Sequence, residues 1–481
     1  MSDSSPPSRR SLLRALGAVG VAGGVGVAAR TGTTDASAAT SQRQTPAEWP
    51  QLGFDAAKTA TVDEATLPDP PRGQLWRTRE GEESVSAPVT DGDRVYYGHD
   101  EGLTAVDAET GEVAWTRTVG NVRGAPAVTD DLVVAGTNRQ TVTARNPEIG
   151  GQEWQREVGG PIHADVTVTD DAVYAASVDG DVVAIDTSNG RELWRTAVDA
   201  AVREAPAYDD ESEQVVVVDD EKNLTALAES DGSENWSSKV RAVATGAPTV
   251  YEGLVIAVNE IGDVHAFSVN SGDERWLERT SEELADSPAV DDDTLYIATE
   301  NGQVRAQSTV AGSRRWLTDV PGQPTAGPIL VGDTLLVGTD SPRILALRRR
   351  DGQERWRLDL AGDPIESLAL ARGRLFFTRS DGSVTGLGTV TTPTPTTTQT
   401  PTPTTTRTPT PTTTQTPTPT TTQTPTPTTT TTEPPTTTTE PPTTEPPTTT
   451  ATRLFGPGFG PLAAVAALGL VAWRAVRNAD D

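Results

Sequence analysis

The chain has 481 residues, no cysteine and a formal net charge of −29, with lysine only at Lys58, Lys222 and Lys239. The absence of cysteine excludes disulfide bonds, thiolate metal sites, cysteine nucleophiles and a lipid-modified N-terminal cysteine. Nucleic-acid binding is disfavoured because no basic stripe is present to neutralise phosphates. A surface rich in carboxylates and poor in lysine suits concentrated salt, where charge repulsion is screened, so we expect a halophilic source. An acidic face for a basic partner is the alternative.

Residues 1–39 have the pattern of an export signal. Arg9 and Arg10 precede an apolar run rich in glycine and alanine, and Ala36-Ser37-Ala38 offers small residues for cleavage. The paired arginines resemble a twin-arginine signal, which implies export of an already folded protein. A plain N-terminal membrane anchor is the alternative. Residues 40–72 then form a polar, proline-bearing lead-in.

A repeat follows, in which a small residue precedes a glycine by six positions and a tryptophan by ten, as in Ala105, Gly111 and Trp115. The tryptophans are 39 to 42 residues apart. They are Trp76, Trp115, Trp154, Trp194, Trp236, Trp276, Trp316 and Trp356. Each interval holds a small-Pro-apolar step, acidic or glycine turns and alternating apolar runs, which predicts four short strands per unit. Such units indicate a β-propeller, with an all-β solenoid as the alternative.

The two ends of the repeat predict how the ring closes. Trp76 has no full unit before it, and the last unit has three predicted strands and no tryptophan. Placing the Trp76 strand beside the strand at 383–388 gives eight blades and leaves no frayed edge at the seam. We therefore predict an all-β fold, an eight-bladed β-propeller over residues 73–389.

The tryptophans are predicted to fill the gaps between neighbouring blades, which widen outward. Each indole would bury ~150–250 Å². At ~25 cal/mol/Å² this corresponds to roughly 4–6 kcal/mol per tryptophan before conformational entropy is subtracted. The alanine ten residues earlier should lie on the adjacent strand, where a small side chain leaves room for the ring.

The pattern Ala-x-Asp-x-x-Thr-Gly-x-x-x-Trp, best kept at 105–115 and 184–194, resembles the tryptophan-docking motif of quinoprotein-type eight-bladed propellers. That group holds PQQ-dependent alcohol dehydrogenases and BamB-like scaffold proteins. The resemblance covers residues 48–389, and the run Trp49-Pro50-Gln51 resembles the segment before the first blade of such proteins.

The resemblance implies two contrasting functions. Dehydrogenases of the group have a vicinal cysteine pair over the cofactor and long inter-blade insertions that build the site and bind calcium. This chain has no cysteine and minimal blades. We therefore expect no catalytic residue, no cofactor and no metal, and keep a PQQ-dependent dehydrogenase as the alternative. A BamB-like role in outer-membrane assembly would not transfer to a host without an outer membrane.

Few other residues stand out as sites. His99, His163 and His265 fall at dissimilar places in their repeats, so isolated histidines are expected rather than a metal cluster. Asn223 and Asn235 fit the N-glycosylation pattern, which matters only for an exported domain. Asn235 adjoins Trp236, where crowding would block modification, so Asn223 is favoured.

The C-terminal part differs sharply in composition. Residues 390–452 are almost entirely threonine and proline, which predicts a disordered, extended and O-glycosylated stalk, with a bare linker as the alternative. In residues 453–481, Pro457, Gly458 and Phe459 precede a short apolar run, predicted to be a helix, and a basic end. This resembles the PGF-type C-terminal sorting signal of archaeal surface proteins. It implies that an archaeosortase replaces the tail with a lipid; a retained anchor is the alternative.

Taken together, these features predict an exported, membrane-anchored propeller at the cell surface that binds a partner rather than transforming a substrate. We expect envelope or surface proteins as partners, apart from the export and sorting machinery. The binding surface should be the mouth of the central channel or the loops on one face of the ring. An extracellular solute receptor is a third hypothesis.

Overall fold

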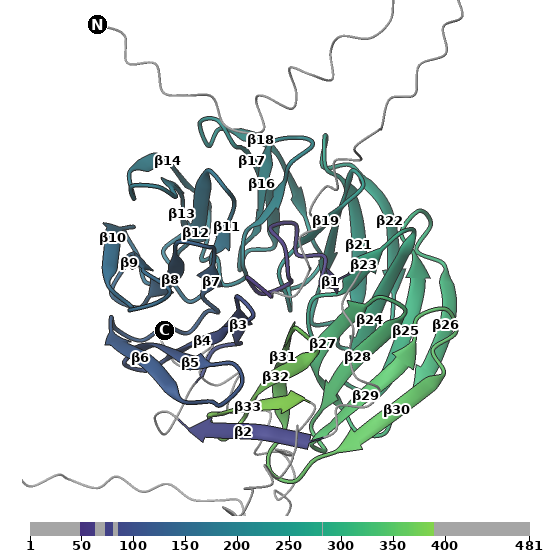
Figure 1. Cartoon of the computed structure of the whole chain (residues 1–481). Coiled ribbons are helices and arrows are strands. Elements are labelled where there is room, and N and C mark those ends of the chain that lie inside the picture. The colour runs from purple at the N-terminus through teal and green to yellow at the C-terminus, as the bar shows by residue number, and fades with distance from the viewer. Residues whose placement is uncertain (1–48, 63–72, 80–84, 281, 389–481) are drawn as a thin grey trace, which may run out of the picture. The chain divides into compact units, whose positions relative to one another are not determined.

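The computed structural model describes residues 49–62, 73–79, 85–280 and 282–388. In these residues eight sheets radiate from a common axis, and no helix is present (Figure 1). The predicted all-β, eight-bladed propeller is therefore confirmed. The predicted signal with Arg9 and Arg10, the stalk, and the sorting motif with Pro457, Gly458 and Phe459 lie outside the described residues.

Blades 1 to 6 each contain four consecutive antiparallel strands, ordered from the axis outward. Blade 1 comprises β3 (Val89–Thr90), β4 (Arg94–His99), β5 (Gly102–Asp107) and β6 (Val113–Thr118). Blade 2 comprises β7 (Ala127–Val128), β8 (Val133–Thr137), β9 (Thr141–Arg145) and β10 (Gln152–Glu157). Blade 3 comprises β11 (Thr167–Val168), β12 (Ala172–Ala176), β13 (Asp181–Asp186) and β14 (Glu192–Ala197).

The next three blades repeat this arrangement. Blade 4 comprises β15 (Ala207–Asp209), β16 (Gln214–Val218), β17 (Asn223–Ala228) and β18 (Glu234–Lys239). Blade 5 comprises β19 (Thr249–Tyr251), β20 (Leu254–Val258), β21 (Asp263–Ser268) and β22 (Glu274–Arg279). Blade 6 comprises β23 (Ala289–Asp291), β24 (Thr294–Thr299), β25 (Gln303–Ser308) and β26 (Arg314–Asp319).

The last two blades each take a strand from the N-terminal part of the chain. Blade 7 comprises β27 (Pro324–Val331), β28 (Thr334–Thr339), β29 (Arg343–Arg348) and β30 (Glu354–Asp359), with β1 (Thr61–Val62) added parallel to β27. Blade 8 comprises β31 (Ile365–Ala371), β32 (Arg374–Arg379) and β33 (Ser383–Gly388), with β2 (Gly73–Arg79) outermost.

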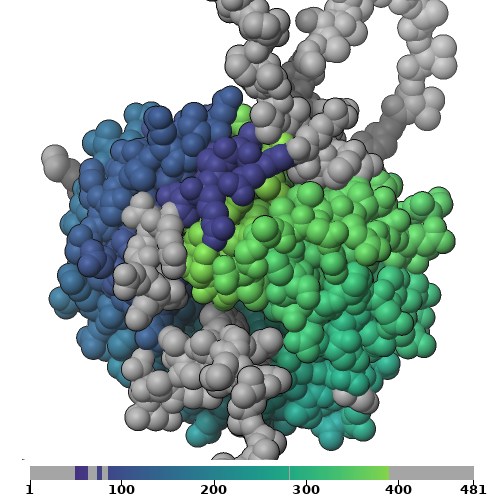
Figure 2. Space-filling model, turned by 90° about the horizontal axis from the view of Figure 1, so that it is seen from below, coloured from purple at the N-terminus to yellow at the C-terminus, as the bar shows by residue number. Residues whose placement is uncertain are grey.

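The seam of the ring lies in blade 8, as the spacing of the repeats predicts. β2 pairs antiparallel with β33, so that Gly73 lies opposite Gly388 and Trp76 opposite Gly386. An ion pair between Arg77 and Asp381 joins the same two strands. Seen from below, the purple atoms of β2 lie against the yellow-green atoms of the last strands (Figure 2). Because β2 covers β33, the C-terminal strand is not a sheet edge.

Each tryptophan lies opposite a small residue on its own blade. Ala105, for example, pairs with Trp115, and Ala184 pairs with Trp194, while Gly386 takes this place for Trp76. The packing role assigned to the alanines is therefore seen directly. Trp76, Trp115, Trp154, Trp194 and Trp236 are buried, whereas Trp276, Trp316 and Trp356 are half-buried.

The repeated glycine contacts the tryptophan of the preceding blade as well as turning its own chain. Gly232 has a φ of +71°, and a Cβ added to it would lie 2.5 Å from the Trp194 ring. The indole nitrogen of Trp194 donates a hydrogen bond to the carbonyl oxygen of Glu229, at 2.7 Å, in the same turn of blade 4. Equivalent bonds link the other blades in succession. No such bond is found for Trp356 among the described residues, because blade 8 takes its outer strand from the N-terminus and lacks that turn.

The described residues contain no helix with the length and hydrophobicity needed to cross a bilayer.

Candidate functional site

The lead-in, as residues 49–62 are called from here on, runs round one mouth of the ring, and Figure 1 shows it in purple near the axis. Trp49 begins this path beside blade 1 through two backbone hydrogen bonds with Thr90, of 3.0 and 2.8 Å. The carbonyl oxygen of Pro50 then accepts a bond of 2.7 Å from the backbone nitrogen of Val128 in blade 2. At blade 3 the Gln51 side chain bonds both the nitrogen and the oxygen of Val168, at 3.1 and 3.2 Å.

The lead-in continues past blades 4 to 7 in the same manner. Its carbonyl oxygens accept one backbone N–H from each innermost strand: Tyr208 to Ala56 at 2.8 Å, Val250 to Ala57 at 2.8 Å, Val290 to Thr59 at 2.9 Å and Leu330 to Ala60 at 2.9 Å. The innermost strand of a propeller blade is a sheet edge whose free N–H groups point toward the axis. The lead-in satisfies these groups in seven blades, which explains its position.

The backbone of the lead-in adopts the left-handed conformation at three non-glycine residues. Phe54, Lys58 and Ala60 have φ values of 70°, 62° and 51° without being glycine. Residues other than glycine adopt this left-handed region rarely, at a cost of about 1–3 kcal/mol each, and such residues cluster at functional sites. The contacts with seven blades hold this conformation in place.

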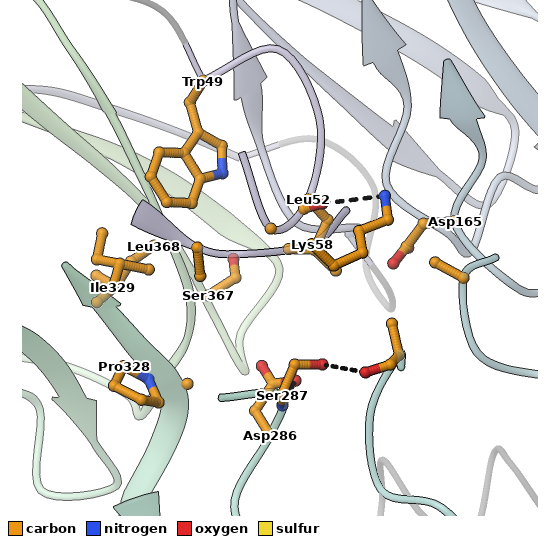
Figure 3. Close-up of a pocket in the computed structure, with 15 residues that line it drawn as sticks. Trp49, Leu52, Lys58, Asp165, Asp286, Ser287, Pro328, Ile329, Ser367 and Leu368 are labelled. Carbon is orange, nitrogen blue, oxygen red and sulfur yellow. Dashed lines mark hydrogen bonds between the residues drawn. The ribbon is translucent and has the colours of Figure 1, made fainter. Parts of the chain in front are cut away.

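A small pocket of about 50 Å³ lies between the lead-in and the blades (Figure 3). The lead-in contributes Trp49, Leu52, Gly53, Lys58 and Ala60 to its wall. Blades 3 to 8 contribute residues from equivalent positions about 40 residues apart: Asp165, Ala205, Ala247, Ser287, Gly327 and Ser367. Five of these six are small, and Asp165 is the exception.

Lys58 is the cation of this pocket. Its side chain is 2% exposed, and its Nζ donates a hydrogen bond of 3.1 Å to the carbonyl oxygen of Leu52. Burial lowers the pKa of Lys58 to about 8, although the negative charges of Asp165 and Asp55 oppose the shift. Figure 3 shows the Lys58 amine on the side of the pocket where Asp165 lies. Asp165 in turn accepts a bond of 2.6 Å from the backbone nitrogen of Ala125, so its carboxylate is fixed between blades 2 and 3.

Two further carboxyl groups lie beside the equivalent small residues of blades 6 and 8. Asp286 lines the pocket and accepts a bond of 2.6 Å from the backbone nitrogen of Ser287. Glu366 precedes Ser367, and its burial, together with the charge of Asp381, raises the pKa of Glu366 to about 7. The pocket therefore combines one buried ammonium with two carboxyl groups, Asp165 and Asp286, in a space of a few water molecules, and Glu366 adjoins the lining residue Ser367 in the sequence.

A larger, polar depression of about 320 Å³ lies between blades 1 and 2. Its wall includes Asp100, Asn121, Asn138 and Arg139, and Asn121 donates a bond of 2.7 Å to Asp100. These residues belong to the turns between the second and third strands and to the loop between blades. Both lie on the face of the ring opposite the lead-in, because the lead-in bonds the far ends of the innermost strands.

The structure does not bring the three histidines together. His99 ends β4 in blade 1, His163 precedes blade 3, and His265 lies in β21 of blade 5. His265 is buried, with its Nδ1 2.7 Å from Glu274 Oε1. Among the described residues no group of three or more histidines and carboxylates is arranged to hold a metal ion.

The two glycosylation sequons differ in accessibility in a way the sequence does not indicate. Asn223 is 7% exposed and donates a bond of 2.7 Å to Asp219, so its amide is occupied inside blade 4. Asn235 is exposed on β18, because the alternation of the strand turns Trp236 inward. The geometry therefore favours Asn235 over Asn223, and glycosylation itself stays a prediction.

Sequence reasoning missed the path of the lead-in and the role of Lys58. One signal was present: blades 1, 2 and 4 to 7 have a small residue followed by proline at this position, whereas blade 3 has Asp165-Val166. A charged residue at a position kept small in the other blades indicates a partner of opposite charge.

The sequence and the fold match a known family. The family model described as outer membrane protein assembly factor BamB matches four overlapping stretches, residues 63–165, 150–276, 208–330 and 311–394. The BamB protein of Alkalilimnicola ehrlichii is 28% identical over 179 residues, which are 37% of this chain and 38% of that protein. That of Yersinia pestis is 28% identical over 207 residues, 38% of this chain and 51% of that protein. The chain thus spans about half or less of the length of these relatives.

Solved structures show the same architecture at lower identity. BamB from Moraxella catarrhalis superposes with a TM-score of 0.55 and 19% identity, covering 66% of this chain and 99% of that one. The quinohemoprotein alcohol dehydrogenase from Comamonas testosteroni superposes with a TM-score of 0.59 and 12% identity, covering 72% of this chain and 81% of that one. At such identities the likeness shows the fold alone.

Proposed function

The chain belongs to the family of the outer membrane protein assembly factor BamB, and from this premise we propose that it is a non-catalytic scaffold that binds another protein of the cell envelope. The curated relatives carry the name of an assembly factor, which supports a binding role. Export, a surface location and attachment to the membrane belong to the same proposal and rest on the terminal sequence patterns.

The observation that carries the proposal is the size of the pocket at the axis. Sites for drug-sized ligands and cofactors typically enclose ~300–1,000 Å³. The pocket under the lead-in measures about 50 Å³. A quinone cofactor, or a solute of more than a few atoms, does not fit there while the lead-in is in place. This argues against a cofactor or solute site at the axis and favours binding through the outer faces of the ring.

We assign the partner to the face opposite the lead-in. The lead-in occupies the mouth on its own side, whereas the opposite face carries the polar depression between blades 1 and 2. Polar side chains on loops held by a rigid scaffold are a common form of protein-binding surface. The depression offers Asp100 and Arg139 as charged groups of both signs.

Affinity capture of the intact protein from its native envelope, in high salt and after mild cross-linking, tests this assignment. We expect an envelope protein to co-purify in stoichiometric amount with the wild type. Arg139→Glu, on the proposed face, should abolish this recovery, whereas Asp231→Arg, an exposed turn residue on the lead-in face, should leave it unchanged. If Asp231→Arg abolished the recovery and Arg139→Glu did not, the partner would bind the lead-in face and the assignment would be wrong.

A second measurement tests the scaffold role against catalysis. The purified protein is incubated with PQQ and calcium, and both cofactor retention and dye-linked alcohol oxidation are measured. We expect neither. Retention of one PQQ per chain with oxidation of an alcohol would overturn the proposal in favour of a quinoprotein dehydrogenase.

A further inference from the structure

We propose that the mouth framed by the innermost strands of blades 1 to 7 is a peptide-binding site, specific for tryptophan, glutamine and lysine at the first, third and tenth positions of its ligand. The chain occupies this site with its own lead-in. The inference concerns the face opposite the proposed partner surface and goes beyond the proposed function.

Backbone hydrogen bonds supply affinity for such a peptide without specifying its sequence. Six innermost strands donate a backbone N–H to a carbonyl oxygen of the lead-in, and blade 3 is bonded by the Gln51 side chain instead. Main-chain recognition of this kind binds a peptide of almost any sequence, and side-chain pockets then provide selectivity. Because all eight blades present similar strands, backbone bonds alone would allow several rotational positions round the ring.

Three side chains of the lead-in make contacts that fix one position. Trp49 is 1% exposed and lies in the hydrophobic cluster that also contains Ile329 of blade 7 and Leu368 of blade 8. Gln51 forms its pair of hydrogen bonds with Val168 of β11. Among the described residues, this is the only innermost strand that one side chain of the lead-in bonds through both a backbone nitrogen and a backbone oxygen. Lys58 is held in the axial pocket with the charge of Asp165 acting on it.

The charge of Asp165 is the feature that distinguishes one blade from its neighbours. The equivalent residues of blades 2 and 4 are Ala125 and Ala205. A lead-in rotated by one blade would place the Lys58 ammonium beside one of these methyl groups and away from the Asp165 carboxylate, which lines the same pocket. Moving a buried cation away from the carboxylate whose charge acts on it is unfavourable, so Asp165 selects against wrong positions more than it adds affinity.

The test uses the full chain with a protease site introduced between residues 63 and 72, outside the described residues. After cleavage, a fluorescently labelled synthetic peptide of residues 45–64 is added in excess, and its incorporation is followed by anisotropy. A second sample is unfolded and refolded with the labelled peptide present, so that slow release of the original segment does not mask binding. We expect saturable binding of one peptide per chain, and no binding of a scrambled peptide.

Two matched substitutions probe the specificity. Asp165→Asn keeps an acceptor for the Ala125 nitrogen while removing the charge, and Lys58→Met in the peptide keeps the length of the side chain. Each should weaken binding at least about tenfold, and the two together should weaken it no more than either alone. Asp170→Asn, an exposed turn residue of the same blade, should have no effect.

A separate experiment measures the rotational position of the bound peptide round the ring, independently of its affinity. Leu52 of the peptide is replaced by photo-leucine, whose neighbours in the wild type belong to the cluster of blades 1 and 2. We expect cross-links confined to those blades with the wild-type peptide, and cross-links spread over further blades with Lys58→Met. The proposal is wrong if the scrambled peptide binds equally well, if no peptide enters the refolded protein, or if the cross-links of the two peptides coincide.

Discussion

At the scale of single residues, one indole joins two blades through three different contacts. Trp194 lies opposite Ala184 on its own blade, packs on Gly232 of the next blade and donates to the Glu229 carbonyl there. Each partner requires a particular residue: a small side chain, a glycine with positive φ, and a turn that presents a carbonyl oxygen. The fixed spacing of alanine, glycine and tryptophan in the sequence records these requirements.

Trp194→Ala removes all three contacts at once. We expect a loss of about 3–5 kcal/mol in the free energy of unfolding, because a buried indole is replaced by a cavity. Urea denaturation followed by circular dichroism measures the loss. The neighbouring Leu193 is 43% exposed, and Leu193→Ala is expected to cost less than about 1 kcal/mol. Equal losses for the two variants would refute the docking role.

Glu366 should make stability depend on pH. Its pKa is raised by burial from an ordinary value of 4.5 to about 7, so the folded state binds a proton more tightly than the unfolded state. The contribution of Glu366 is therefore most favourable below pH 4.5 and is lost as the pH rises through 7.

In Glu366→Gln, stability is not lost as the pH rises through 7, because the amide stays neutral where the carboxyl group would ionise. Relative to the wild type, the variant should gain about 1–3 kcal/mol between pH 4.5 and pH 7 and no more above it. Unfolding free energies measured across this range check the expectation. The exposed Glu211→Gln should follow the wild type at every pH. If the unfolding free energies of Glu366→Gln and the wild type differed by the same amount at every pH, the expected role of Glu366 would be contradicted.

At the scale of elements, the strand positions and the seam could be predicted from the sequence, whereas the lead-in could not. The strands follow from alternating apolar residues and turn signals, and the missing tryptophan of the last unit predicted β2 as the outer strand of blade 8. The lead-in has no periodicity, and six of its seven blade contacts use backbone atoms, which leave no mark in the sequence. The axial pocket was missed for the same reason, with Asp165 as its single visible sign.

The seam also yields an unexpected prediction about Gly386. Its position corresponds to alanine in the other seven blades, so Gly386→Ala restores the repeated residue. A Cβ at Gly386 would lie 2.6 Å from the Trp76 ring, however, so an alanine would require the ring or the strand to shift. We expect the substitution to cost about 1–3 kcal/mol in unfolding free energy by overpacking.

The control is Gly151→Ala, where an added Cβ would meet its nearest atom at an ordinary distance of 3.5 Å. Denaturant midpoints of the two variants test the expectation: the midpoint should fall for Gly386→Ala and stay near that of the wild type for Gly151→Ala. A stabilised Gly386→Ala protein would mean that the seam tolerates the same packing as the other blades.

At the scale of the whole molecule, charge is distributed unevenly round the ring. Residues 85–320 contain 45 acidic and 17 basic residues, whereas residues 321–388 contain nine arginines and eight acidic residues. Arginines of the second group reach carboxylates of neighbouring blades, as Arg374 reaches Glu109 at 3.4 Å and Arg349 reaches Asp291 at 2.5 Å. The last two blades are therefore nearly balanced, while repulsion is concentrated in blades 1 to 6.

This excess of negative charge predicts that salt stabilises the protein. Between 0.1 and 2 M NaCl the Debye length falls from about 10 Å to below about 3 Å, so repulsion between carboxylates is screened. We expect the melting temperature to rise by at least about 5 °C, and calorimetry over a series of NaCl concentrations measures it. A variant with Asp130, Asp131 and Asp170 changed to asparagine should gain less from salt. A melting temperature independent of salt would contradict the expectation.

The position of β33 between β32 and β2 has a mechanical consequence. Force applied to the chain beyond Gly388 would act along β33, which is bonded on both sides, so the rupture would have to shear two rows of hydrogen bonds together. A terminal strand at the rim would instead peel away one bond at a time. The interlocked blade makes the propeller resistant to pulling from its C-terminal end, which suits a domain held under tension.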